Sequence, residues 1–161
     1  MMKSALVVGG LVLALAVPNY AIVQKEHVLA SGTPMLLALA PVDPRSLIGG
    51  YYMRLDYAIT RTMAAEKNTW PRDGHIIVIL DSVGVAQFVR RHEPGTPLSS
   101  GEHLLQYRRR AGRYRVGTDA FNFQEGLARH YQGARYGDLR VDDKGESVLV
   151  GLRDSMRVAL Q

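Results

Sequence analysis

The chain has 161 residues, 47% of them hydrophobic and 22% charged, which is typical of one folded globular domain and not of a disordered chain. It contains no cysteine, which excludes a disulfide framework, thiolate zinc sites and iron–sulfur ligation. The formal net charge of +5 favours anionic partners, such as lipid headgroups or an acidic protein surface.

The N-terminal segment predicts where the protein resides. Residues 4–23 contain no ionisable side chain except that of Tyr20, and a segment of this length can cross the hydrocarbon core of a bilayer. Lys3 is the only charged side chain before it, so the positive-inside rule keeps the N-terminus in the cytoplasm. We expect residues 1–24 to form a signal-anchor transmembrane helix of a single-pass protein of the bacterial inner membrane, with a periplasmic C-terminal domain.

A cleaved signal peptide is the alternative, with Ala14-Leu15-Ala16 as its cleavage site. The apolar sequence continues past that site to Val23, which favours the uncleaved anchor. Within the anchor, Gly9, Gly10 and Ala14 are small enough to let another transmembrane helix approach closely. We expect these three residues to contact a partner.

Residues 25–33 are expected to form a connector and residues 34–161 a β-rich domain. Short apolar or alternating segments separated by turn residues are typical of strands; they lie at 35–40, 52–57, 75–80, 85–90, 103–109, 114–117, 139–141 and 147–151. Residues 58–67 fit either a helical turn or an extended continuation, and residues 124–135 have helical spacing. The prediction is a mainly β, barrel- or sandwich-like domain with one short helix packed across it.

The segment from Pro41 to Tyr57 reads PVDPRSLIGGYYMRLDY and resembles the signature of the GDYXXLXY family, membrane-anchored bacterial proteins without an established activity. The matching positions are Gly50, Tyr52, Leu55 and Tyr57, whereas Tyr51 replaces the aspartate of the motif. Residues 123–126 with 134–137, and residues 139–141 leading to 149–153, are similar to the C-terminal half of that family. The resemblance implies an anchored domain and no defined catalytic residue.

The motif also has a physical interpretation. Asp43-Pro44 starts a turn, because the proline ring fixes φ near the value that a β-turn needs. Gly50 permits a close backbone approach just before a strand. Leu55 and Tyr57 share one face of that strand, where a tyrosine ring can fill the end of a barrel. We favour a folding signature, and a ligand-binding role stays open.

The most distinctive charged feature is a tyrosine-flanked basic hairpin over residues 107–115. It carries Arg108, Arg109, Arg110, Arg113 and Arg115. Because side chains alternate along a strand, Arg108 and Arg110 are expected on one face and Arg109 on the other. The ribbon can rest on anionic lipid headgroups or bind an acidic partner, or it is a solvated edge whose charges discourage aggregation. Export makes nucleic acid an unsuitable partner.

No set of residues identifies a reaction, and we expect no enzymatic activity, no metal and no cofactor. The interpretation we favour is a non-enzymatic envelope protein, an accessory subunit or assembly factor that binds an integral membrane protein or membrane complex. Two alternatives stay open. One is an envelope hydrolase, with Asp43, Asp56, Asp81 and His92 as its candidate residues; the other is a periplasmic sensor or ligand-binding domain with a pocket near Tyr52 and Tyr57.

Overall fold

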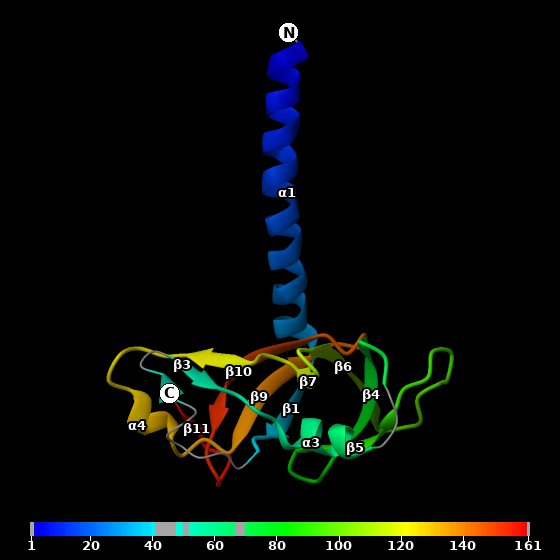
Figure 1. Cartoon of the computed structure of the whole chain (residues 1–161), viewed down its shortest axis with the longest axis vertical. Helices are drawn as coiled ribbons and strands as arrows, with labels where there is room; N and C mark the ends of the chain where they lie inside the picture. The colour runs from blue at the N-terminus through cyan, green and yellow to red at the C-terminus, as the bar shows by residue number, and fades with distance from the viewer. Residues whose placement is uncertain (1, 41–47, 50–51, 67–69, 161) are drawn as a thin grey trace.

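In the computed structural model, one long helix projects from a β-rich domain (Figure 1). The structure describes the chain except for residues 1, 41–47, 50–51, 67–69 and 161, and it leaves out the side chains of residues 2–9, 12, 48, 49 and 128. The long helix, α1, spans Met2–Ser31 and contains Pro18. The described residues of the domain include two short helices, α3 (Ala58–Ala65) and α4 (Ala128–Tyr131).

The described strands form three antiparallel sheets. The first has the order β1 (Thr33–Ala38), β9 (Tyr136–Val141), β10 (Ser147–Arg153) and β11 (Ala159–Leu160). The second has the order β5 (Ala86–Arg91), β4 (Asp73–Leu80), β6 (Glu102–Arg110) and β7 (Arg113–Val116). The third is small and consists of β2 (Ile48–Gly49), β3 (Tyr52–Arg54) and β8 (Ala120–Asn122).

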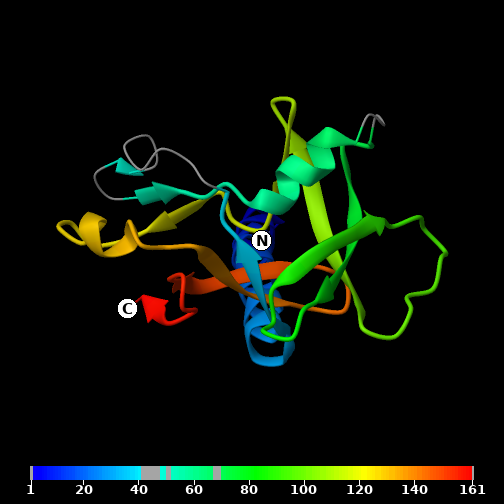
Figure 2. The same cartoon turned by 90° about the horizontal axis from the view of Figure 1, so that it is seen from below.

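The hydrophobic core lies between the two four-stranded sheets, each of which is curved like half of a barrel (Figure 2). Both sheets contribute fully buried side chains, among them Leu37 and Leu139 from the first and Ile76 and Leu105 from the second. The two sheets also meet directly where the Leu36 N–H donates to the Gly84 carbonyl, at 2.9 Å. The mainly β class predicted from the sequence is confirmed.

The helices differ from the prediction. Residues 58–67, which the sequence left open, are helical over Ala58–Ala65, because Ile59, Thr60 and Met63 fall on one face and are buried. The helix expected over residues 124–135 is confined to Ala128–Tyr131. The described part of the domain therefore contains two short helices where one was predicted.

The segment expected to be a connector, residues 25–33, is also mostly helical. It continues α1 as far as Ser31, and only Gly32 separates α1 from β1. The polar residues around Lys25 suggested a loop, but Val28 is buried against the domain, at 1% exposure, and this packing stabilises the last turns of α1. The domain is thus joined to α1 through a short, packed junction.

Within the described part of the chain, which omits the side chains of residues 2–9 and 12, no helix is both long enough and apolar enough to cross a membrane. The transmembrane span predicted for residues 1–24 gains no support from this finding.

Candidate functional site

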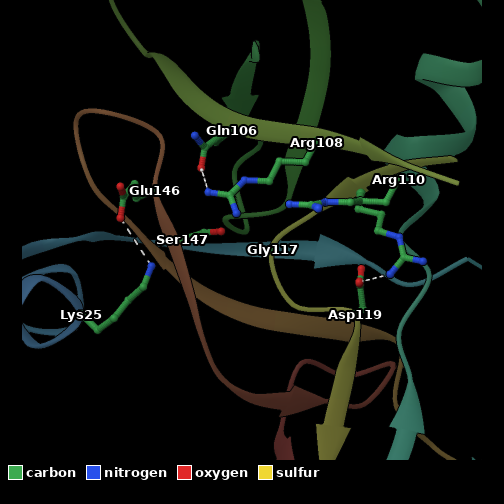
Figure 3. A pocket seen from close by; sticks show the side chains of 9 residues that line it. Lys25, Gln106, Arg108, Arg110, Gly117, Asp119, Glu146 and Ser147 are labelled. Atoms are coloured by element: carbon green, nitrogen blue, oxygen red, sulfur yellow. Dashed lines mark hydrogen bonds and ion pairs between the residues drawn. The ribbon is translucent and has the colours of Figure 1, made fainter. Parts of the chain in front are cut away.

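A polar cavity of about 330 Å³ lies where α1, the β6–β7 hairpin and the turn before β10 meet (Figure 3). Nine residues line it: Lys25, Gln106, Arg108, Arg110, Arg115, Gly117, Asp119, Glu146 and Ser147. Its volume is at the lower end of the range found for small-molecule sites. We call it the basic cavity.

The β6–β7 hairpin supplies three of the cations. Its turn residues Ala111 and Gly112 both have positive φ, 47° and 76°, the conformation that matches the twist of a tight hairpin. Side chains alternate along β6, so Arg108 and Arg110 extend from the same face into the cavity (Figure 3). Arg109 lies on the other face, with its guanidinium carbon 5.7 Å from the centre of the Tyr114 ring. The predicted alternation is confirmed.

The turn between β9 and β10 forms the opposite wall. It docks on the part of β6 that β7 does not cover, where the Gln106 N–H donates to the Gly145 carbonyl at 2.9 Å. Gly145 has φ +81°, and a Cβ there would lie 3.1 Å from the Gln106 nitrogen. This close approach needs glycine, and it brings Glu146 and Ser147 to the cavity.

Charges in the cavity are only partly compensated. The Lys25 ammonium lies 3.4 Å from a Glu146 carboxylate oxygen, and Arg115 pairs with Asp119. Arg108 donates to the Gln106 side-chain oxygen, at 3.4 Å. Neither Arg108 nor Arg110 has a carboxylate partner in the described part of the chain. Four cationic and two carboxylate side chains give the cavity a formal charge of +2, which suits it to bind an anion.

Tyr57, the last tyrosine of the motif, lies beneath the floor of the cavity. Its side chain is buried, at 2% exposure, and its hydroxyl has no hydrogen-bond partner among the described residues. A Cβ built on Gly117 would lie 3.9 Å from this hydroxyl oxygen and 3.6 Å from that of Ser147. Burial, reinforced by the nearby Asp119 carboxylate, raises the pKa of Tyr57 well above its usual range.

This raised pKa predicts a loss of stability at alkaline pH. An unfolded tyrosine ionises near pH 10, whereas the folded chain keeps the proton on Tyr57, so the free energy of unfolding falls as the pH rises above about 10. Each buried tyrosine of this kind lowers the free energy of unfolding by at most about 1.4 kcal/mol per pH unit. Burial also raises the pKa of Tyr107, which therefore acts in the same direction. Urea unfolding from pH 8 to pH 11 measures the slope.

The variant Tyr57→Phe is expected to show a shallower slope, because it removes one of these groups. At neutral pH it should be as stable as the wild type, since the lost hydroxyl has no partner. Tyr52→Phe is the matched control, because Tyr52 is 46% exposed. Equal slopes in Tyr57→Phe and the wild type would rule out Tyr57 as a source of the alkaline effect.

The other motif residues are divided between the surface and the core. Leu55 is 6% exposed, and Tyr52 lies exposed on β3, opposite Asn122 of β8. Asp43, Pro44 and Gly50 lie outside the described residues. Burial of both Leu55 and Tyr57 supports a folding role for the described part of the motif.

The remaining predicted contact residues fall into two groups. Gly9, Gly10 and Ala14 lie on the projecting part of α1, and a Cβ on Gly10 would meet nothing within 4 Å. In the hairpin, Arg108, Arg110 and Arg115 come together in the basic cavity, whereas Arg109 and Arg113 do not line it. Sequence reasoning missed the residues that complete the cavity from other elements: Lys25, Gln106, Gly117, Asp119, Glu146 and Ser147.

The three described candidates for hydrolase chemistry, Asp56, Asp81 and His92, do not line the basic cavity. An Asp56 carboxylate oxygen lies 3.6 Å from Arg61. Asp81 accepts hydrogen bonds from the Val83 and Val85 N–H groups, at 3.0 and 2.8 Å, and these bonds lower its pKa. Asp81 therefore stabilises the β4–β5 turn.

Two candidates of that set remain, His92 and Asp43. The His92 ring lies 6.4 Å from the His75 ring, and Asp43 is outside the described residues. Among the residues that the structure describes, no group of three or more His, Cys, Asp or Glu side chains is placed to hold a metal ion.

Comparison with known proteins gives one match. The family model described as GDYXXLXY protein matches residues 14–152, which include β3, the β6–β7 hairpin and all nine residues that line the basic cavity. No curated protein and no solved structure matches the chain.

Proposed function

The chain belongs to the GDYXXLXY protein family, and from this premise we propose that it is a non-enzymatic accessory subunit or assembly factor of a larger membrane complex. In this proposal α1 anchors the protein in the bacterial inner membrane, with its N-terminus in the cytoplasm. The β-rich domain then lies in the periplasm, at the membrane surface. The observation that carries the proposal is the exposed apolar surface of α1.

This surface extends around the whole described part of the projecting helix. Six large apolar side chains in residues 11–23 are more than half exposed: Leu11, Leu13, Leu15, Val17, Ile22 and Val23. They are spread over all sides of α1, which leaves no polar face to turn toward water. Lipid chains or other apolar helices are the surroundings in which such a helix is stable. The sequence of residues 4–9 continues the same apolar pattern.

The junction between α1 and the domain supports an anchored arrangement. Val28 is buried against the domain, and the Gly32 N–H donates to the Val28 carbonyl at 2.9 Å. Because one glycine separates α1 from β1, there is no long linker over which the domain could move away. An anchored α1 would therefore hold one side of the domain at the membrane surface.

The chemistry of the basic cavity favours binding over catalysis. Arginine side chains are always protonated and donate hydrogen bonds without accepting them, so they cannot act as general bases. The two carboxylates, Asp119 and Glu146, are each engaged by a cation. A cavity built from these groups can recognise an anionic partner and position the domain against it.

Contact with a partner helix is testable on the small residues of α1. Gly10 and Ala14 lie one turn apart on the same face, and a Cβ on Gly10 meets nothing within the chain. The variants Gly10→Leu and Ala14→Leu should therefore leave the fold intact while preventing close approach of a partner helix. Ala16→Leu is the matched control, because Ala16 is exposed on a different face of α1.

The readout is purification of the tagged full-length chain from native membranes in mild detergent. We expect the co-purifying complex to be lost with Gly10→Leu and Ala14→Leu and kept with Ala16→Leu, while all variants stay in the membrane fraction. A complex that survives all three substitutions would show that this face of α1 makes no partner contact. A wild-type chain that co-purifies with nothing would contradict the accessory-subunit proposal.

A further inference from the structure

The basic cavity lies beside the end of α1 that joins the domain, because Lys25 of α1 is one of its lining residues (Figure 3). We propose that it binds the phosphate group of an anionic phospholipid in the periplasmic leaflet. This inference rests on the proposed membrane anchor for the source of the phosphate. The ligand chemistry itself rests on the side chains of the cavity.

The hydrogen-bond donors of the cavity match a phosphate group. Arg108 and Arg110 extend from β6 into the same space (Figure 3), and neither is neutralised by a carboxylate among the described residues. The planar guanidinium group matches phosphate oxygens with paired N–H donors, and such charge-assisted hydrogen bonds are among the strongest in proteins. Two uncompensated guanidinium groups side by side repel each other, and a bound phosphate removes that repulsion.

A neutral donor also lies beside these guanidinium groups. The Ser147 hydroxyl belongs to a residue that lines the same cavity (Figure 3), and a hydroxyl can donate a hydrogen bond to a phosphate oxygen. The Tyr57 hydroxyl lies behind Gly117, is closed off from solvent and does not line the cavity, so the anion is bound without it.

The position of the cavity along α1 places it near the lipid headgroups if α1 spans the membrane. Lys25, which lines the cavity, follows the end of the apolar segment at Val23 by two residues. With a rise of about 1.5 Å per residue, its Cα lies only about 3 Å farther along the helix. If residues 4–23 span the hydrocarbon core, the cavity lies at the level of the headgroups. The anionic groups nearest to the cavity would then be the phosphates of membrane lipids.

Native mass spectrometry of the full-length protein in detergent tests the proposal, with phosphatidylglycerol and neutral phosphatidylcholine as the two lipid probes. We expect one phosphatidylglycerol to be retained in preference to phosphatidylcholine. Arg110→Gln should weaken this binding by about tenfold or more, because it removes a charge-assisted contact. Arg113→Gln is the matched control: Arg113 pairs with Arg110 across the hairpin, is exposed, and does not line the cavity.

Two further ligands, inorganic phosphate and polyglutamate, show whether the cavity binds a lipid, free phosphate or an acidic protein. Inorganic phosphate that binds with the same dependence on Arg110, without any lipid adduct, would overturn the assignment to a lipid. An acidic peptide, polyglutamate, that binds in place of phosphatidylglycerol would assign the cavity to a protein partner instead. Equal lipid retention by Arg110→Gln and Arg113→Gln would overturn the site. Circular dichroism of both variants shows that the fold is intact.

Membrane extraction of the same variants keeps this inference separate from the proposed function. A chain that stays in the membrane but retains no phosphatidylglycerol would refute the lipid site alone. A chain recovered without membranes would refute the anchor, whatever the cavity binds.

Discussion

Replacing Trp70 with alanine is expected to lower the free energy of unfolding by about 3–5 kcal/mol, the usual cost of removing a buried tryptophan side chain. Trp70 is 3% exposed and is the only tryptophan of the chain. Its ring centre lies 6.0 Å from that of Phe88, 5.4 Å from that of Tyr107 and 5.6 Å from that of Tyr114. These partners belong to β5, β6 and β7, so one side chain joins three strands of the second sheet.

The loss would also disturb the basic cavity indirectly. Tyr107 and Tyr114 pack edge to face at 5.8 Å, and they lie on the two strands of the hairpin that carries Arg108, Arg110 and Arg115. A domain of this size has a total stability of about 5–15 kcal/mol. Trp70→Ala should therefore remove a large part of it, and a fraction of the variant should be unfolded under mild conditions.

Urea unfolding followed by far-ultraviolet circular dichroism measures this prediction, since the variant lacks the fluorescent tryptophan. Trp70→Phe keeps an aromatic ring in the cluster and should cost less than Trp70→Ala. Val89→Ala, at a position on β5 that is 40% exposed, should have little effect. A Trp70→Ala midpoint equal to that of Val89→Ala would contradict the role assigned to this cluster.

Gly32→Ala is expected to lower the free energy of unfolding by about 1–3 kcal/mol, the usual cost of overpacking a tight site. A Cβ at Gly32 would lie 2.4 Å from the Val28 carbonyl oxygen, 3.0 Å from the Val141 nitrogen and 3.2 Å from the Arg140 carbonyl carbon. All three are backbone atoms of α1 and β9, which cannot move as a flexible side chain can. The substitution must therefore shift α1 relative to the domain.

The matched control for Gly32→Ala is Gly151→Ala. Gly151 lies on β10 in the same sheet, and a Cβ there would meet nothing within 4 Å. Thermal unfolding of both full-length variants should give a midpoint several degrees lower for Gly32→Ala and an almost unchanged midpoint for Gly151→Ala. Equal midpoints would mean that α1 is not held by the contact at Gly32.

Much of the fold could be predicted from the sequence, because its strands are short and are separated by residues typical of turns. The β4–β5 turn at Asp81–Gly84, the tight turn at Ala111–Gly112 and the turn at Asp142–Gly145 carry residues that tolerate or stabilise turn geometry. The strands on both sides of each turn were predicted, and in the structure each of the three pairs forms an antiparallel hairpin. Alternation along residues 107–110 likewise predicted which arginines share a face.

Other features depend on contacts between distant parts of the chain, which local patterns do not reveal. The residues around Lys25 are polar and suggested a connector, yet Val28 makes that segment helical by packing on the first sheet. The basic cavity joins Lys25 to Glu146, which are 121 residues apart. The close contact between Gly145 and Gln106 brings the β9–β10 turn and β6 together, and these form two walls of the cavity. Three of the predicted arginines line the cavity, but their cavity partners could not be derived from spacing alone.

The most direct test of the central claim is extraction of the full-length chain from native membranes. The membranes are washed at alkaline pH and dissolved in mild detergent, and the intact mass of the chain and of every co-eluting protein is measured. The proposed function predicts a chain that resists the wash, retains the apolar segment of residues 4–23 and elutes in a defined complex. A processed chain that lacks this segment and runs alone would contradict both the anchor and the accessory role.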